Sequence, residues 1–346
     1  MPFFDFIHDQ REKLPLATSL VPSTVNIKDG TYIVTGANTG LGLECARHLV
    51  SLGAGRVILA VRSVSKGEAA LADIRKTTAR RTAGEVWELD LSSFASVDAF
   101  IARLNTLDRI DGLINNASVA MPNHTFAQGA DVETSIFVNV VTTMLLTVRA
   151  VPKLQESAQK FNMTPHLVIV SSNAGIGNDM KGRVERCQGD VFAAVSKPEG
   201  FTAFSQYPTT KLLQIYAVRE LASLLPVKQT GVVINHVNPG LCYTELDRNA
   251  GILGKLYMAI FRKLLARTAE EGSRTLLQAV WAGQESHGTY CSECRIRDEK
   301  IPEWIADENG HKTQRRVWED LVKRLDKLDH GIDVAELLGS KTAEAK

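Results

Sequence analysis

The sequence feature that most constrains the fold is a glycine-rich turn between an expected strand and an expected helix. The turn reads TGANTGLG, with glycine at 36, 40 and 42, directly after the apolar run TYIVT at 31–35. An amphipathic segment, LGLECARHLVSL, follows it. Glycine lets the backbone approach a phosphate closely, and the free N–H groups at a helix start face the anion. The turn therefore predicts a phosphate site where this strand meets this helix.

Apolar, strand-like runs alternate with helix-period segments along most of the chain. Continuous Val/Ile/Leu runs separated by helices are typical of a parallel sheet that is buried on both faces. The pattern predicts one doubly wound α/β domain at 31–284, after a lead at 1–30 and before a helical C-terminal extension at 285–346. The expected strands are TYIVT at 31, RVILAV at 56, EVWELDL at 85, GLINNA at 112, HLVIVSS at 166 and VVINHVNP at 232.

The composition of the chain argues against nucleic-acid-binding, metal-binding and membrane-spanning proteins. The chain has 40 Lys plus Arg against 39 Asp plus Glu, so its bulk charge gives no case for a nucleic-acid partner. We interpret the five cysteines as reduced thiols, and CSEC at 291–294 as structural because no second ligand pair accompanies it, so we expect no metal site. The chain lacks an apolar run of about 18 residues and a signal-peptide layout, which predicts a cytoplasmic protein without a transmembrane segment.

Tyr207 and Lys211 stand four residues apart at the start of a helix-period segment. On a helix this spacing places both side chains on one face. Two unit charges about 4 Å apart interact by roughly 4 kcal/mol at an effective dielectric of about 20, so a lysine can favour the phenolate and lower the pKa of a tyrosine. The spacing alone leaves two readings open, a solvated surface pair and an acid–base pair.

Further motifs follow the glycine turn in order. They are LDLSS at 89, NNAS at 115, FVNVVTTMLLT at 137, VIVSSNAG at 168, the Tyr207–Lys211 pair and NPGLCYTEL at 238. The ordered set spans residues 31–246 and resembles the short-chain dehydrogenase/reductase family, including its retinol-dehydrogenase-like and fungal natural-product members. The resemblance implies a Rossmann-type fold and an NAD(P)-dependent oxidoreductase of secondary metabolism. Ser118 departs from the pattern, because the family's motif after the fourth strand is NNAG.

The resemblance implies four catalytic residues. Tyr207 is the proton donor and acceptor, Ser172 holds the substrate oxygen, and Lys211 bonds the cofactor ribose. Asn139 holds a water that relays protons from Lys211 to solvent. We prefer Ser172 over its neighbour Ser171, because the second serine of the pair is the family's catalytic one.

The residues expected to bind the cofactor come from the same motifs and from the second strand. They are Gly36, Thr39, Gly40, Leu41, Gly42, Arg62, Lys66, Asp90, Asn116, Ala117, Tyr207, Lys211, Pro239, Gly240, Leu241 and Thr244. Val61 stands where NAD-selective proteins carry an acid, and Arg62 follows it. A guanidinium binds a phosphate through two hydrogen bonds, which favours NADP(H) and leaves NAD(H) as the alternative. Thr39 weakens this preference, because some NADP-preferring relatives have a basic residue there.

Three segments outside the motifs bear on substrate and partners. An insert at 173–205 carries Phe192, Phe201 and Phe204, which we expect on a wall or lid over a bulky apolar substrate. A substrate lid is expected at 241–267, where GILGKLYMAIFRKLLAR presents Lys255, Arg262, Lys263 and Arg267 on one face. A basic amphipathic helix can serve as a lid or a dimer contact, or it can lie on a membrane surface. The sequence leaves both alternatives open. The extension is expected to include a helix packed through Val317, Leu321 and Leu325.

These expectations combine into an NADPH-dependent reductase of a ketone or aldehyde on a bulky hydrophobic small molecule. The alternatives are an alcohol dehydrogenase that runs in the oxidative direction and a non-catalytic dinucleotide-binding scaffold or sensor. Family members commonly form dimers or tetramers through the helices that carry Asn139 and Tyr207. The resemblance therefore leaves a homodimer as an alternative, unless the C-terminal extension blocks that interface.

Overall fold

An eight-stranded sheet forms the centre of the computed structural model, which describes residues 3–80, 84–243 and 265–328. The strand order is β3-β2-β1-β4-β5-β6-β7-β8, and every neighbouring pair is parallel except β7 and β8. The strands are β1 (Thr31–Thr35), β2 (Arg56–Val61), β3 (Glu85–Glu88), β4 (Gly112–Asn115), β5 (His166–Val170), β6 (Val233–Asn238), β7 (Tyr290–Ser292) and β8 (Arg295–Ile296). The predicted doubly wound fold is confirmed, and all six expected strands are present.

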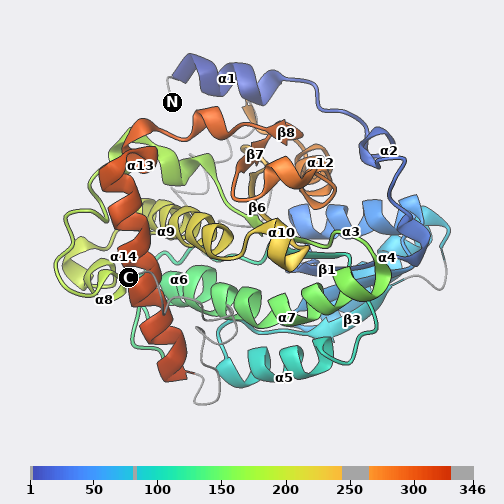
Figure 1. Cartoon of the computed structure of the whole chain (residues 1–346), viewed down its shortest axis with the longest axis horizontal. Coiled ribbons are helices and arrows are strands. Elements are labelled where there is room, and N and C mark those ends of the chain that lie inside the picture. Colours follow the sequence, from blue (N-terminus) through green and yellow to red (C-terminus); the bar gives the residue numbers. More distant parts are fainter. Residues whose placement is uncertain (1–2, 81–83, 244–264, 329–346) are drawn as a thin grey trace.

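Helices cover both faces of the sheet, and β1, β5 and β6 are buried along their whole length (Figure 1). One face carries α3 (Gly40–Leu52), α4 (Val64–Thr78) and α12 (Ala269–Val280). The opposite face carries α5 (Phe94–Leu104), α9 (Ala203–Leu224) and a continuous helical run made of α6 (Thr134–Ile136), the π-helical turn η2 (Phe137–Thr142) and α7 (Thr143–Phe161). Each face has its own hydrophobic core.

The run Thr134–Phe161 is the one helix in the described part of the chain that is long and apolar enough to cross a membrane. Of its most apolar window, 89% is buried inside the protein. Its apolar character is therefore that of a core helix packed against the sheet.

The strand order reverses beside β1, which lies between β2 and β4. In open α/β sheets the carboxyl ends of the strands form a crevice at this switch point, and ligands bind there. Both the glycine turn after β1 and the NNAS segment after β4 belong to this edge. The fold thus brings together motifs that lie about eighty residues apart.

The C-terminal part differs from the sequence expectation. Strands β7 and β8 were not predicted, and β7 pairs with β6, so residues after 284 complete the sheet. The helix α14 (Glu308–Leu328) follows and packs on α9, with Val317, Leu321 and Leu325 fully buried as predicted. Shorter helices are α1 (Phe3–Arg11), α2 (Ala17–Leu20), α8 (Val191–Val195), α10 (Val227–Thr230) and α13 (Glu303–Ala306).

The insert before Tyr207 binds the C-terminal helix. Phe192, expected on a substrate wall, is fully buried beneath Arg324 of α14, whose guanidinium carbon lies 5.6 Å from the ring centre. Arg324 also pairs with Asp190, and the Val191 N–H donates to Asp320 of α14. The expectation for Phe192 was wrong, because the pattern of the insert gave no sign that a distant helix would cover it.

Two other phenylalanines of the insert are more accessible. Phe201 is half-buried and packs edge-on against His124, and Phe204 is 78% exposed at the start of α9. Most of the expected lid, with Thr244, Lys255, Arg262 and Lys263, lies outside the described residues.

Arg267 is described, and it was wrongly expected on an exposed basic face. It is only 6% exposed, and its guanidinium donates to the backbone carbonyl of Asp9 in α1.

Candidate active site

The glycine turn after β1 has the geometry expected of a phosphate site. Gly36 and Gly40 adopt φ angles of 67° and 57°, in the left-handed region that favours glycine. A side chain on Gly42 would place its Cβ 2.5 Å from the Asn116 amide nitrogen. Thr39 is the N-cap of α3, and its side chain does not cap the helix. The first N–H groups of α3 are therefore left for an anion.

Ser172, Tyr207 and Lys211 come together at the far end of the crevice. Ser172 follows β5, whereas Tyr207 and Lys211 lie one turn apart on α9, whose start is capped by Thr202. The Tyr207 hydroxyl is hydrogen-bonded to Ser172, and the Lys211 Nζ lies 5.3 Å from the centre of the tyrosine ring. Lys211 is only 1% exposed, which excludes a solvated surface pair and favours the interpretation of Tyr207 and Lys211 as an acid–base pair.

A close backbone approach holds these groups together. The loop after β5 forms the 3₁₀ turn η3 (Asn173–Ile176), and a Cβ on Gly175 would lie 2.6 Å from the Leu212 nitrogen and 2.7 Å from the Lys211 carbonyl carbon. Only glycine permits this spacing. Gly175 therefore sets how near Ser172 stands to α9.

The protonation preferences differ from the sequence expectation. Burial raises the pKa of Tyr207, and the hydrogen bond from Ser172 opposes the rise only in part. Burial also lowers the pKa of Lys211 to about 7. The expected lowering of the Tyr207 pKa by Lys211 is therefore not seen here, because burial disfavours the charged form of both groups.

Asn139 lies in the π-helical turn η2, behind the pocket wall. Its side chain accepts from the Val119 N–H at 2.8 Å and donates to the Val119 carbonyl and to Thr210. Its backbone carbonyl accepts from the Gln214 amide at 2.5 Å. The side chain thus clamps the loop after β4 to α9.

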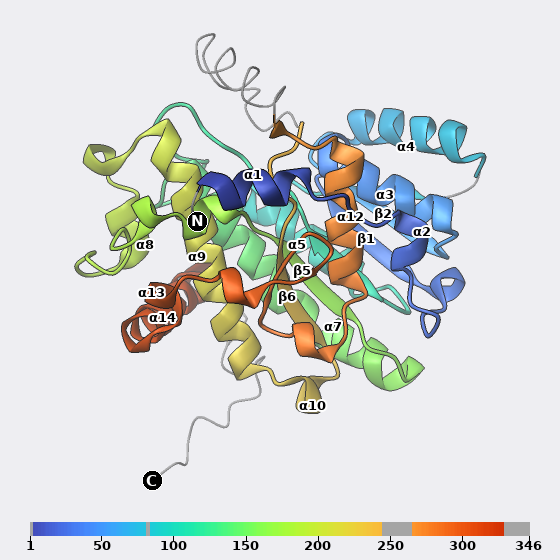
Figure 2. The ribbon, with the colours of Figure 1, turned by 90° about the horizontal axis from the view of Figure 1, so that it is seen from above.

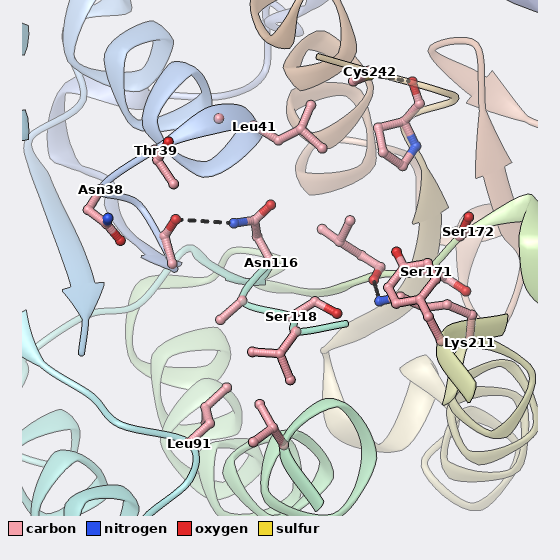
Figure 3. Close-up of a pocket in the computed structure, with 18 of the residues that line it drawn as sticks. Asn38, Thr39, Leu41, Leu91, Asn116, Ser118, Ser171, Ser172, Lys211 and Cys242 are labelled. Atoms are coloured by element: carbon pink, nitrogen blue, oxygen red, sulfur yellow. Dashed lines mark hydrogen bonds between the residues drawn. The ribbon is translucent and has the colours of Figure 1, made fainter. Parts of the chain in front are cut away.

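A pocket of about 590 Å³ joins the glycine turn to Ser172, Tyr207 and Lys211. Figure 3 shows Asn38 and Thr39 on one side, Ser171, Ser172 and Lys211 on the other, and Leu91 and Cys242 at the two remaining edges. The predicted residues that line it are Gly36, Thr39, Gly40, Leu41, Arg62, Lys66, Asp90, Asn116, Ala117, Ser172, Tyr207, Lys211, Pro239, Gly240 and Leu241.

Two predicted site residues that the structure describes do not line the pocket. Gly42 lies beneath the turn, and Asn139 lies behind the wall. Residues that the sequence analysis missed include Asn38, Ser63, Ser92, Val119 and Val138. Each of the five lies one or two residues from a predicted site residue, so the motifs marked these segments but not these side chains.

The two basic residues after β2 lie at the glycine-turn end. Arg62 and Lys66 are exposed, line the pocket, and make no side-chain hydrogen bond or ion pair with any residue that the structure describes. Asp90, across from them on the loop after β3, uses one oxygen for the N–H and hydroxyl of Ser92. The two cations and the start of α3, which the side chain of Thr39 does not cap, give this end a preference for anions.

The donor set fits a dinucleotide. Apart from the cations, the Ser118 hydroxyl and the Ser171 hydroxyl line the pocket and are buried without a partner among the described residues. Ser172, in contrast, accepts from the Ala174 N–H at 3.2 Å and bonds Tyr207. These contacts join the Ser172 hydroxyl to Tyr207, whereas the Ser171 hydroxyl makes no such contact with the described residues.

Fold and pocket together define a dinucleotide-binding oxidoreductase, and comparisons with known proteins give its family. A family model described as short chain dehydrogenase matches residues 31–184. A short chain dehydrogenase/reductase of Cryptosporiopsis sp. is 41% identical over 321 residues, which cover 92% of this chain and 97% of that protein. A short chain dehydrogenase of Emericella nidulans is 38% identical over 289 residues, covering 82% and 88%. The chain belongs to the short-chain dehydrogenase/reductase family and is an NAD(P)-dependent oxidoreductase with fungal relatives, as its motifs predicted.

Solved structures show the same fold at lower identity. Levodione reductase is 20% identical with a TM-score of 0.59, over 77% of this chain and 96% of that one. A short-chain dehydrogenase from Sphingobium yanoikuyae in complex with NADPH is 21% identical with a TM-score of 0.53, over 72% and 82%.

Proposed function

We propose that this protein is an NADPH-dependent reductase that converts a ketone or aldehyde of a bulky hydrophobic small molecule to the alcohol. The observation that carries the proposal is the hydrogen-bonded Tyr207–Ser172 pair with the Lys211 ammonium over the tyrosine ring, at the end of the pocket opposite the cation pair. A scaffold or sensor has no need of this arrangement.

The chain's own residues supply the proton chemistry. A bound nicotinamide cofactor supplies the hydride. Ser172 donates a hydrogen bond to the carbonyl oxygen and stabilises the negative charge that develops there. Tyr207, kept protonated by burial, transfers its proton to that oxygen, and Lys211 stabilises the phenolate that remains.

Support for NADPH comes from Arg62 and Lys66. Both face the pocket without partners among the described residues, and the strand before them ends in Val61 rather than an acid. Solved relatives in complex with NADPH or NADP have the same fold. Two cations at this position favour the cofactor that carries a 2′-phosphate.

The cofactor preference is testable by fluorescence titration of the protein with NADPH and with NADH. We expect NADPH to bind at least tenfold more tightly, because a charge-assisted hydrogen bond contributes about 1.5–3 kcal/mol. Arg62→Ala should weaken NADPH binding and leave NADH binding unchanged. Equal affinity for both cofactors in the unmodified protein would contradict the role of Arg62.

Support for a bulky apolar substrate comes from two aromatic residues. Phe204 is 78% exposed one turn before Tyr207, and Tyr243, which follows the loop after β6, is 45% exposed. Exposed aromatic groups favour a hydrophobic ligand, and Phe204 stands on the same helix as Tyr207, three residues before it. A panel of bulky ketones and aldehydes with NADPH, run beside the matching alcohols with NADP⁺, tests class and direction together. Faster turnover of the alcohols would favour the oxidative alternative.

A further inference from the structure

The hydrogen bonds around Lys211 single out a residue that the motifs did not. Gln214 lies three residues further along α9 and is 1% exposed. Its Oε1 accepts from the Lys211 Nζ at 2.9 Å, and its Nε2 donates to the backbone carbonyl of Asn139 at 2.5 Å. We propose that Gln214 is a positioning residue that ties the Lys211 ammonium group to the backbone of η2; its catalytic meaning rests on the proposed function.

The donors of Lys211 show what Gln214 achieves. An ammonium group has three N–H donors. One goes to the Val170 carbonyl of β5 at 2.8 Å and a second to Gln214. With two directions fixed, the third N–H points in one direction only. A long, flexible side chain thereby becomes a rigid part of the site, which is how an active site gains catalytic geometry.

Gln214 also occupies the position that the family resemblance gives to a relay water. That water would bridge Lys211 and Asn139, and the Gln214 amide bridges the same two groups. An amide N–H is not an acid at neutral pH, so Gln214 holds the ammonium group without passing a proton. Asn139 is then the anchor of Gln214.

The surroundings of Lys211 make its pKa a direct readout of Gln214. On its own helix, Lys211 faces Gln214 and the titratable group Tyr207. From β5 it meets the Val170 carbonyl. The turns η2 and η3 contain no charged side chain. Burial lowers the pKa of Lys211 to about 7. Each acceptor favours the charged form, so losing one lowers the pKa and adding a carboxylate raises it.

The test compares Gln214→Met and Gln214→Glu with a matched control, Gln206→Met. Gln206 is also 1% exposed on α9 and makes two side-chain hydrogen bonds, to Glu133 and the Val195 carbonyl, away from Lys211. The pKa of Lys211 is measured by carbon-13 NMR of labelled lysine in the full chain, with the signal assigned through Lys211→Met.

We expect Gln214→Met to lower the pKa of Lys211 by about one pH unit. Gln214→Glu should raise it by about one to three pH units, while Gln206→Met should leave it unchanged. If both Gln214 variants kept the unmodified value, or moved it no more than Gln206→Met, the proposal would be overturned.

Measuring the reduction rate against pH distinguishes a failure of this proposal from a failure of the proposed function. Reduction needs a protonated Lys211, so its rate falls as pH rises through the Lys211 pKa. The pH of half-maximal rate should move down in Gln214→Met and up in Gln214→Glu, and kcat should fall about ten- to hundredfold in Gln214→Met. A protein that reduces no carbonyl but shows the NMR shifts would refute the proposed function and leave the role of Gln214 standing.

Discussion

At the scale of single residues, the two serines after β5 illustrate what the structure adds to the motif. The motif gives two adjacent hydroxyl groups, and either could hold a substrate oxygen. In the structure Ser172 bonds Tyr207, whereas the buried Ser171 hydroxyl has no partner among the described residues. Replacing Ser171 by alanine would therefore break no hydrogen bond within the described part of the protein.

This contrast gives a prediction for Ser172→Ala and Ser171→Ala. We expect Ser172→Ala to lower kcat by about 10²- to 10³-fold, because it removes a donor to the developing oxyanion. Ser171→Ala should change kcat by less than about tenfold. Steady-state kinetics on the same carbonyl substrate measure both. A larger loss in Ser171→Ala than in Ser172→Ala would reverse the assignment.

The pair Tyr207 and Lys211 shows which properties of a residue can be predicted from the sequence and which cannot. The four-residue spacing predicted that Tyr207 and Lys211 share a helix face, since helical geometry fixes it. The spacing could not predict the protonation of the pair, which depends on how deeply the fold buries both groups. Gln214 was missed for the same reason, because its partner Asn139 lies 75 residues earlier in the chain.

At the scale of elements, the N-terminal helix α1 braces the loop after β6. The Gln10 side chain donates to the Leu241 carbonyl at 2.9 Å and accepts from the Leu241 N–H at 3.1 Å. It also donates to the Leu265 carbonyl at 3.2 Å. Leu241 lines the pocket, so α1 helps to set the shape of the cofactor site from outside it. Figure 2 shows α1 running from beside α9 toward α12.

We therefore expect Gln10→Leu to weaken NADPH binding about tenfold, because three hydrogen bonds to the loop are lost and each contributes about 1 kcal/mol or less. The thermal midpoint of the protein should fall by only a few degrees. Titration with NADPH and a thermal melt of the same sample check both. Unchanged NADPH affinity would show that α1 is a structural cover without influence on the site.

The elements differ in how well their sequence predicts them. The first six strands are long apolar runs bounded by turn residues, so their pattern alone places them. Strand β7 is three residues long and lies within YCSEC, which has no such pattern. The pairing of the insert with α14 depends on Arg324 and Asp190, which lie 134 residues apart. Contacts of this kind leave no local signal.

At the scale of the whole molecule, the C-terminal helix changes the expected assembly. Family members commonly form dimers through the helices that carry Asn139 and Tyr207. Here α14 packs along α9, with Leu321 fully buried and Gln314 bonded to Glu220 of α9 (Figure 1). A second subunit could reach this face of α9 only after α14 had moved away.

We thus predict a monomer in solution, measured by light scattering coupled to size-exclusion chromatography. Deletion of residues 308–346 uncovers the apolar face of α9, and we expect that variant to form dimers or larger species. Lys312→Ala, on an exposed side chain of α14, should remain monomeric. A dimer of the full chain would contradict the prediction.

The central claim, that Tyr207 drives carbonyl reduction, is tested most directly by Tyr207→Phe. This change removes one oxygen, the proton donor, and leaves the ring beneath Lys211 in place. The measurement is NADPH consumption with a bulky carbonyl substrate, with NADPH affinity determined on the same preparation. We predict a loss of turnover of at least about a hundredfold with NADPH affinity unchanged within a few-fold. Turnover equal to that of the unmodified protein would contradict the account.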